Sequence, residues 1–82
     1  MAGRRVFTGT NRSNEAGNLH GVLIDPSGAP WAVEIQDSTG KTIFQTGGAA
    51  DVPFYAGPLD IDFDALNVTT ATAITKIICY LG

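Results

Sequence analysis

The stretch from Trp31 to Gln45, WAVEIQDSTGKTIFQ, constrains the fold more than any other part of the chain. Apolar residues at 31, 33 and 35 alternate with small or polar ones, which is the period of a β-strand with one buried face. A second run rich in β-forming residues follows at 41–45. Between the two runs, Asp37 can bond its own backbone and Gly40 can adopt a positive φ. We predict a β-hairpin closed by a glycine bulge, on which the other strands assemble.

Further strand-like segments occur along the chain and are separated by Gly/Pro-rich turns. An edge strand is predicted at 4–8, and Leu19–Ile24 has Leu19 and Leu23 on one face and Val22 and Ile24 on the other. The segment 59–65 alternates apolar residues with aspartates. No window has a helical period. The sequence predicts an all-β fold, a small β-sandwich or jelly roll of about six to eight short antiparallel strands. We expect a single domain, 1–82, with an N-terminal arm at 1–17 and a strand core at 18–82.

Charge is scarce and unevenly distributed. Charged residues make up 16% of the chain and apolar residues 44%, with a net charge of −3. A small soluble domain normally carries more surface charge, so we expect either a Ser/Thr/Asn/Gly-rich surface or a surface covered by a partner. The negative balance argues against nucleic acid as the partner. No apolar run is long enough to span a bilayer, and we predict neither a signal peptide nor a membrane partner.

The basic residues gather near the N-terminus. Arg4, Arg5 and Arg12 are three of the five basic residues in the chain. We predict that this arm docks on a neighbouring subunit, with Val6 and Phe7 in an apolar groove and the arginines on carboxylates. The alternative is a solvated basic tail.

The last strand is apolar on both faces. Ile77, Cys79 and Leu81 form one face, and the other face is formed by Ile74, Ile78 and Tyr80. A sandwich of 82 residues cannot cover both, so we expect the second face at a subunit interface. The single cysteine is predicted to be a buried free thiol.

Two groups of residues are candidates for ligand binding. Asp60, Asp62 and Asp64 alternate along one strand face, where they are solvated, pair with arginines or bind a cation. Their spacing resembles the start of an EF-hand loop, but Ala65 and Ala71 stand where that loop needs Gly and Glu. Trp31 and Tyr55 could stack on a sugar, although the alternation places Trp31 in the core.

The sequence offers no arrangement typical of catalysis. His20 is the only histidine, and no Ser/His/Asp, Cys/His or paired-carboxylate pattern stands out. We therefore expect a protein that is not an enzyme and has no cofactor or metal.

Three segments carry a resemblance to a known group of proteins: LHGVLID, WAVEIQDSTGKTIFQT and GPLDIDFDALNVTTATAITKIICYLG. In this order they resemble small structural proteins of tailed bacteriophages, of the capsid cement (decoration) type. Ala65 stands where the pattern has glycine. The resemblance implies a jelly-roll-like homotrimer on the capsid surface of the virion, bound to the major capsid protein. A tail or fibre component is the alternative within this group. A carbohydrate-binding β-sandwich module is the alternative from another class.

Overall fold

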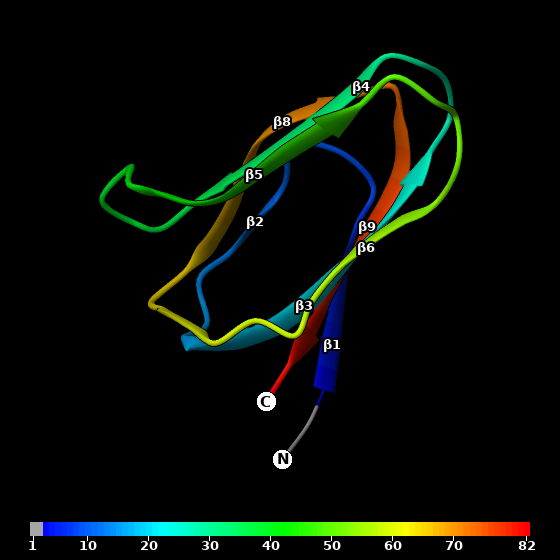
Figure 1. Cartoon of the computed structure of the whole chain (residues 1–82). Helices are drawn as coiled ribbons and strands as arrows, with labels where there is room; N and C mark the ends of the chain where they lie inside the picture. The colour runs from blue at the N-terminus through cyan, green and yellow to red at the C-terminus, as the bar shows by residue number, and fades with distance from the viewer. Residues whose placement is uncertain (1–2) are drawn as a thin grey trace.

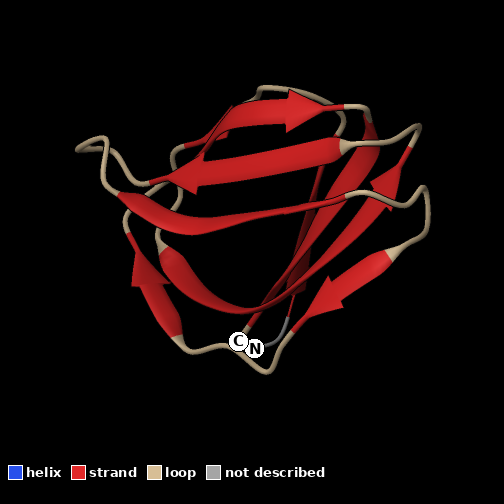
Figure 2. Ribbon diagram, turned by 45° about the horizontal axis from the view of Figure 1, so that its top comes forward, coloured by secondary structure: helices blue, strands red, loops and turns tan. Residues whose placement is uncertain are grey.

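The computed structural model describes residues 3–82, which form two antiparallel β-sheets packed face to face (Figures 1 and 2). Sheet A has the strand order β1-β9-β3-β6, with β7 also paired to β3, and sheet B has the order β2-β8-β4-β5. The nine strands are β1 (Gly3–Phe7), β2 (Arg12–Ser13), β3 (Gly17–Pro26), β4 (Trp31–Gln36), β5 (Thr42–Gly48), β6 (Phe54–Ala56), β7 (Ile61–Phe63), β8 (Leu66–Thr72) and β9 (Ile74–Leu81).

The order of pairing is that of a jelly roll. The pairs β1·β9, β2·β8, β3·β6 and β4·β5 nest inside one another, as in one long hairpin rolled into two four-stranded layers. Strand β7 is an addition to this scheme at the end of β3. The predicted all-β sandwich is confirmed. The described residues have one strand more than the upper expectation, and the two-residue β2 is a strand that the sequence did not predict.

The predicted hairpin is strands β4 and β5, paired from Trp31↔Gly48 to Gln36↔Thr42. Its loop is closed as the turn chemistry requires. The Asp37 N–H donates to the Lys41 carbonyl at 2.9 Å, and Gly40 has a φ of 86°. The Asp37 carboxylate accepts from the Thr39 hydroxyl at 2.6 Å and from the Lys41 N–H at 3.0 Å. The hydroxyl of Thr39 is the main cause of the lowered pKa of Asp37.

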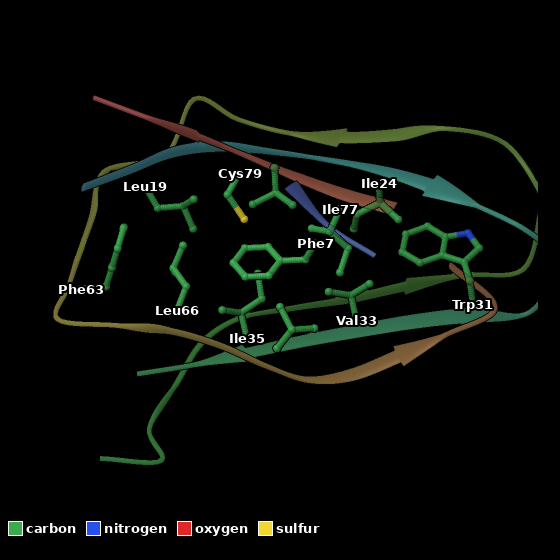
Figure 3. Close-up of a cluster of buried hydrophobic side chains, with 12 residues drawn as sticks. Phe7, Leu19, Ile24, Trp31, Val33, Ile35, Phe63, Leu66, Ile77 and Cys79 are labelled. Carbon is green, nitrogen blue, oxygen red and sulfur yellow. The ribbon is translucent and has the colours of Figure 1, made fainter. Parts of the chain in front are cut away.

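The core fills the space between the two sheets (Figure 3). Strand β4 contributes its whole inward set, strands β3, β8 and β9 contribute most of the rest, and β1 and β7 add Phe7 and Phe63. The members of this cluster are Phe7, Leu19, Val22, Ile24, Trp31, Val33, Ile35, Phe63, Leu66, Val68, Ile77 and Cys79. Apolar residues at alternate positions of facing sheets account for nearly all of it, which is the expected origin of a sandwich core.

The edge strand predicted at 4–8 is confirmed as β1, so the prediction of a separate N-terminal arm is wrong for residues 3–7. Strand β1 pairs with β9 from Gly3↔Leu81 to Phe7↔Ile77 at the edge of sheet A. Phe7 is 5% exposed and lies in the core, as Figure 3 shows. The segment folds back on its own chain because one large aromatic residue reaches the core and β9 offers it a free edge to pair with. Met1 and Ala2 lie outside the described residues.

Two β-bulges in sheet A change which residues share a face. In β3, Leu19 is opposite Leu81 but Gly21 is opposite Tyr80, so His20 is an extra residue. Leu19 therefore shares the inward face with Val22 and Ile24, and Leu23 points outward. This corrects the predicted pairing of Leu19 with Leu23, since a one-residue insertion reverses the alternation.

The second bulge lies in β9. Asp25 is opposite Lys76 but Pro26 is opposite Ile74, so Thr75 is the extra residue. Ile74 consequently packs against the core cluster, whereas it was predicted on the outward face with Ile78 and Tyr80. The predicted inward set of Ile77, Cys79 and Leu81 is confirmed.

Candidate interaction surface

The outward side chains of sheet A form a row of apolar residues across four strands. Val6 of β1 lies opposite Ile78 of β9, Ile78 lies opposite Leu23 of β3, and Leu23 lies opposite Tyr55 of β6. Directly opposite residues in an antiparallel sheet point to the same side, within about 5 Å of one another. We call these four residues the apolar row.

The ends of the apolar row are open to solvent. Val6 is 51% exposed and Tyr55 is 54% exposed, while Leu23 is half-buried. Ile78 lies between Val6 and Leu23 and is only 8% exposed, although it points away from the core. Four large apolar residues of the described chain are exposed, and two of them are the ends of this row. The row is therefore apolar throughout, with a covered centre at Ile78 and two exposed ends.

Glycine shapes one end of this surface. A Cβ added at Gly21 would lie 2.4 Å from the hydroxyl oxygen of Tyr55, and one at Gly57 would lie 2.6 Å from it. The Tyr55 side chain thus lies over Gly21 and Gly57, where no other residue leaves room for it. Its ring also makes an edge contact with Tyr80, with 6.2 Å between the ring centroids.

Charged residues flank the apolar row on both sides. Arg4 lies opposite Tyr80, two residues from Val6, and is exposed. On the other side Lys76 of β9 lies opposite Asp25 of β3. We define the outer face of sheet A as the apolar row together with these neighbours: Arg4, Val6, Gly21, Leu23, Asp25, Tyr55, Lys76, Ile78 and Tyr80. An apolar centre with tyrosines and arginine inside a charged rim is the usual composition of a protein interface.

The outer face of sheet B is polar. Glu34 points outward from β4 and accepts hydrogen bonds from the hydroxyls of Thr42, at 2.6 Å, and Thr69, at 3.0 Å. These bonds, that of Thr42 first, lower the pKa of Glu34. The other residues that point outward around it are Ala32, Gln36, Gln45, Gly47, Asn67, Thr70 and Thr72. Hydroxyl and amide groups therefore cover this face, in contrast to the outer face of sheet A.

The structure divides the predicted interface residues into separate groups. Arg4, Val6 and Tyr80 lie on the outer face of sheet A, with Ile78 buried at its centre. Phe7 is buried in the core, and Ile74 is partly buried and packs against the core. Neither side chain belongs to the outer face of sheet A, which corrects their assignment to one interface with Ile78 and Tyr80.

The three N-terminal arginines do not form one basic cluster. The Arg5 guanidinium lies 5.9 Å from the centroid of the Phe63 ring and 3.8 Å from a carboxylate oxygen of Glu15. It also donates to the Glu15 carbonyl at 3.2 Å. Arg12 lies in β2 of sheet B and donates to the Asn14 side chain at 2.5 Å. Of the three arginines only Arg4 belongs to the outer face of sheet A, so the docking-arm prediction reduces to Arg4 and Val6.

The three aspartates are held within the chain rather than gathered at one site. Asp60 and Asp62 each accept from the side-chain amide of Asn18, at 2.7 and 2.8 Å. Asp64 accepts from the Ser38 N–H at 3.1 Å and from the Ser38 hydroxyl. The Ser38 hydroxyl is the main cause of its lowered pKa. Among the described residues, no group of three or more His, Cys, Asp or Glu side chains is arranged to hold a metal ion.

Trp31 and Tyr55 do not form a sugar platform. Trp31 is 4% exposed, donates from its indole N–H to the Ala50 carbonyl at 3.0 Å, and lies 5.6 Å from the Phe54 ring. It points inward from sheet B, whereas Tyr55 points outward from sheet A. The interpretation of Trp31 as a core residue is confirmed.

Cys79 lies in the core as predicted, and burial raises the pKa of its thiol to about 12. The thiol is therefore protonated at neutral pH, and this side chain acts as a small apolar group.

Sequence reasoning missed Leu23, Asp25 and Lys76 as members of the outer face of sheet A. These residues alternate with the inward residues of their strands, but which of the two apolar faces of β3 and β9 turns inward is decided by strand pairing and sheet packing. The one available signal was the pair of residues His20 and Thr75, at which strict alternation of apolar and polar residues is interrupted.

Comparison with known proteins provides no family for this chain. No protein-family model and no curated protein matches it. One solved structure with a partial likeness is the capsular polysaccharide assembling protein CapF from Staphylococcus aureus, at 6% identity and a TM-score of 0.37. The match covers 98% of this chain and 23% of that chain. Residues 3–82 contain no helix with the length and apolarity needed to cross a membrane.

Proposed function

We propose that this chain is a structural protein of a tailed bacteriophage particle, of the capsid cement type, and acts as a homo-oligomer on the outside of the capsid lattice. The observation that carries the proposal is the outer face of sheet A. Its apolar row leaves Val6 and Tyr55 about half exposed in the isolated chain. A face of this kind gains free energy when another protein covers it.

The fold and the sequence pattern both support this role. Jelly rolls occur in viral capsid domains and also in lectins, so the fold is compatible with the proposal but does not select it. The resemblance of LHGVLID and the two later segments to phage cement proteins favours a role in a virus particle over that of a lectin. A sugar-binding role for Trp31 has no support, because its side chain is buried and cannot stack on a ligand.

The proposed mechanism is the burial of apolar surface between this protein and the coat subunits, repeated at many equivalent positions of the capsid lattice. A protein that binds the assembled lattice but not the separated coat subunits stabilises the lattice, by an amount that grows with its concentration relative to the dissociation constant. No catalytic group takes part. Rim charges such as Arg4 and Lys76 add about 0–1 kcal/mol each, and this contribution is weakened by salt.

The experiment is to detect the chain in purified phage particles and count it against the coat protein by quantitative mass spectrometry. We expect copy numbers comparable to the coat protein, and we expect capsids stripped of the protein to release DNA at a lower temperature until it is added back. A small copy number set by the tail would assign the chain to the tail or a fibre instead. Absence from particles would overturn the proposal.

A further inference from the structure

We propose that the outer face of sheet A binds the same face of a second copy of this chain, around a two-fold axis parallel to the strands between β3 and β9. The inference rests on the assembly role proposed above for this face and names its partner. An interface between identical copies must be self-complementary, so that residue i of one copy meets residue j of the other and the reverse. With the axis between β3 and β9, each row of opposite residues across sheet A meets the same row of the second copy in reverse order. The contacts in each row are then chemically complementary.

The charged row shows the complementarity most directly. Lys76 of β9 and Asp25 of β3 lie opposite each other on the two strands that flank the axis. Rotation about the axis exchanges β9 with β3. It therefore places the Lys76 of each copy over the Asp25 of the other, and two ion pairs form between the copies in place of like-charge contacts.

The apolar row is exchanged in the same way. Ile78 of one copy meets Leu23 of the other at the centre, and Val6 meets Tyr55 at both ends. Each contact joins two apolar side chains, and the two exposed ends of the row cover each other. The partly buried centre and the open ends of a single copy are thus all removed from water.

The row that contains Gly21 brings tyrosine rings of the two copies together. Gly21 lies opposite Tyr80 in the sheet and is covered by the Tyr55 ring of its own copy, so rotation places Tyr80 of one copy over the Tyr55 ring of the other. At the end of the same row, Arg4 approaches the Tyr55 ring that lies over Gly21 and Gly57. Guanidinium groups bind favourably to tyrosine faces. Tyrosine and arginine are also the residues that most often carry binding energy at interfaces.

The size of the face suits a stable dimer. The chain measures 31 × 23 × 16 Å, so its broadest cross-section is of the order of the ~800 Å² per partner of a standard interface. Two sheets that stack face to face about 10 Å apart are a common packing.

This arrangement closes at two copies, in place of the three that the resemblance implies. It leaves the polar outer face of sheet B on both outer surfaces of the dimer, free for contact with another protein.

The test is sedimentation of the purified full chain over about 1–300 µM, a range that spans micromolar dissociation constants. We expect a concentration-dependent shift from monomer to dimer. Val6→Glu is expected to weaken the dimer at least tenfold and Leu23→Glu to abolish it, because both place a charge in the apolar row. Thr72→Glu is the matched control, because Thr72 points outward from sheet B. Circular dichroism of each variant checks that the sandwich is folded.

A dimer that is lost in folded Val6→Glu and retained in Thr72→Glu supports the proposal. A wild-type chain that stays monomeric, or a dimer equally stable in all three variants, overturns it. A trimer that is insensitive to Val6→Glu also overturns it. The particle experiment is separate, since a monomer that attaches to capsids would refute the dimer alone, and a dimer absent from particles would refute the cement role alone.

Discussion

The two outer faces of this sandwich belong to the two sheets of the same jelly roll, yet one is apolar and the other is polar. At the centre of sheet A, the outward Ile78 is almost completely buried between Val6 and Leu23. At the centre of sheet B, the outward Glu34 is hydrogen-bonded by threonine hydroxyls. The low charge of the chain thus has two explanations within one molecule. Uncharged hydroxyl and amide groups hydrate the outer face of sheet B. The outer face of sheet A is apolar and has the composition of a protein interface.

The largest expected effect concerns the strand that brings Val6 and Arg4 to sheet A. Phe7→Ala should destabilise the fold by about 3–5 kcal/mol, because it removes a buried aromatic side chain and the anchor of β1. Val6→Ala, the neighbouring outward change, should cost below about 1 kcal/mol in the monomer, because Val6 is half exposed. Urea unfolding of both variants measures the difference. Equal, small losses would show that residues 3–7 are a free arm after all.

A second prediction compares the centres of the two faces. Ile78→Asp should destabilise the monomer by about 3 kcal/mol, because a carboxylate would be buried there without a partner. Thr72→Asp on the outer face of sheet B should cost below about 1 kcal/mol, since Thr72 is exposed. Thermal unfolding at a concentration below dimer formation separates the two. A stable, folded Ile78→Asp monomer would contradict the burial of Ile78 within the single chain.

A third, smaller effect tests the glycine under Tyr55. Gly21→Ala should displace the Tyr55 ring, because the added Cβ would lie 2.4 Å from the phenol oxygen, at a cost of about 1–2 kcal/mol. The expected readouts are a change in tyrosine fluorescence and a weaker dimer. Gly3→Ala is the control, because a Cβ at Gly3 meets no atom within 4 Å. An unchanged Tyr55 environment in Gly21→Ala would show that the ring does not lie over β3.

The smallest expected effect is a pH dependence on the polar face. Hydrogen bonds lower the pKa of Glu34 below its ordinary value of 4.5. The stabilisation is therefore fully present above that value and is lost as pH falls through the lower pKa of the folded state. Glu34→Gln should flatten the acid side of the stability profile slightly and leave the dimer unchanged. A profile identical to that of wild type would show that the threonine bonds do not favour the charged carboxylate.

Local sequence patterns were sufficient to predict the fold class. The hairpin from Trp31 to Gly48, its turn at Gly40 and the inward set of β9 all follow from alternation and turn chemistry, which act over a few residues. The sequence predicted a small β-sandwich or a jelly roll and could not decide between the two. The nesting of the jelly roll joins β1 to β9, which are at opposite ends of the chain.

The composition of the outer face of sheet A depended on information that local patterns lack. His20 and Thr75 are bulge residues only because of how β3 and β9 pair, and each reverses the faces that follow it. The basic N-terminus suggested an arm because three arginines are close in sequence, but strand pairing separates Arg4, Arg5 and Arg12 in space. Asp60 and Asp62 likewise find their partner in Asn18, which is distant in sequence.

The central claim is the two-fold contact between outer faces of sheet A, and a charge exchange tests it most directly. Lys76→Asp and Asp25→Lys should each weaken self-association, because each variant places like charges at both positions of the exchanged row. Mixing the two variants should restore a dimer that contains one copy of each, detected by native mass spectrometry, because every crossed pair is then of opposite charge. A mixture that contains only the species of the separate variants would contradict the two-fold arrangement.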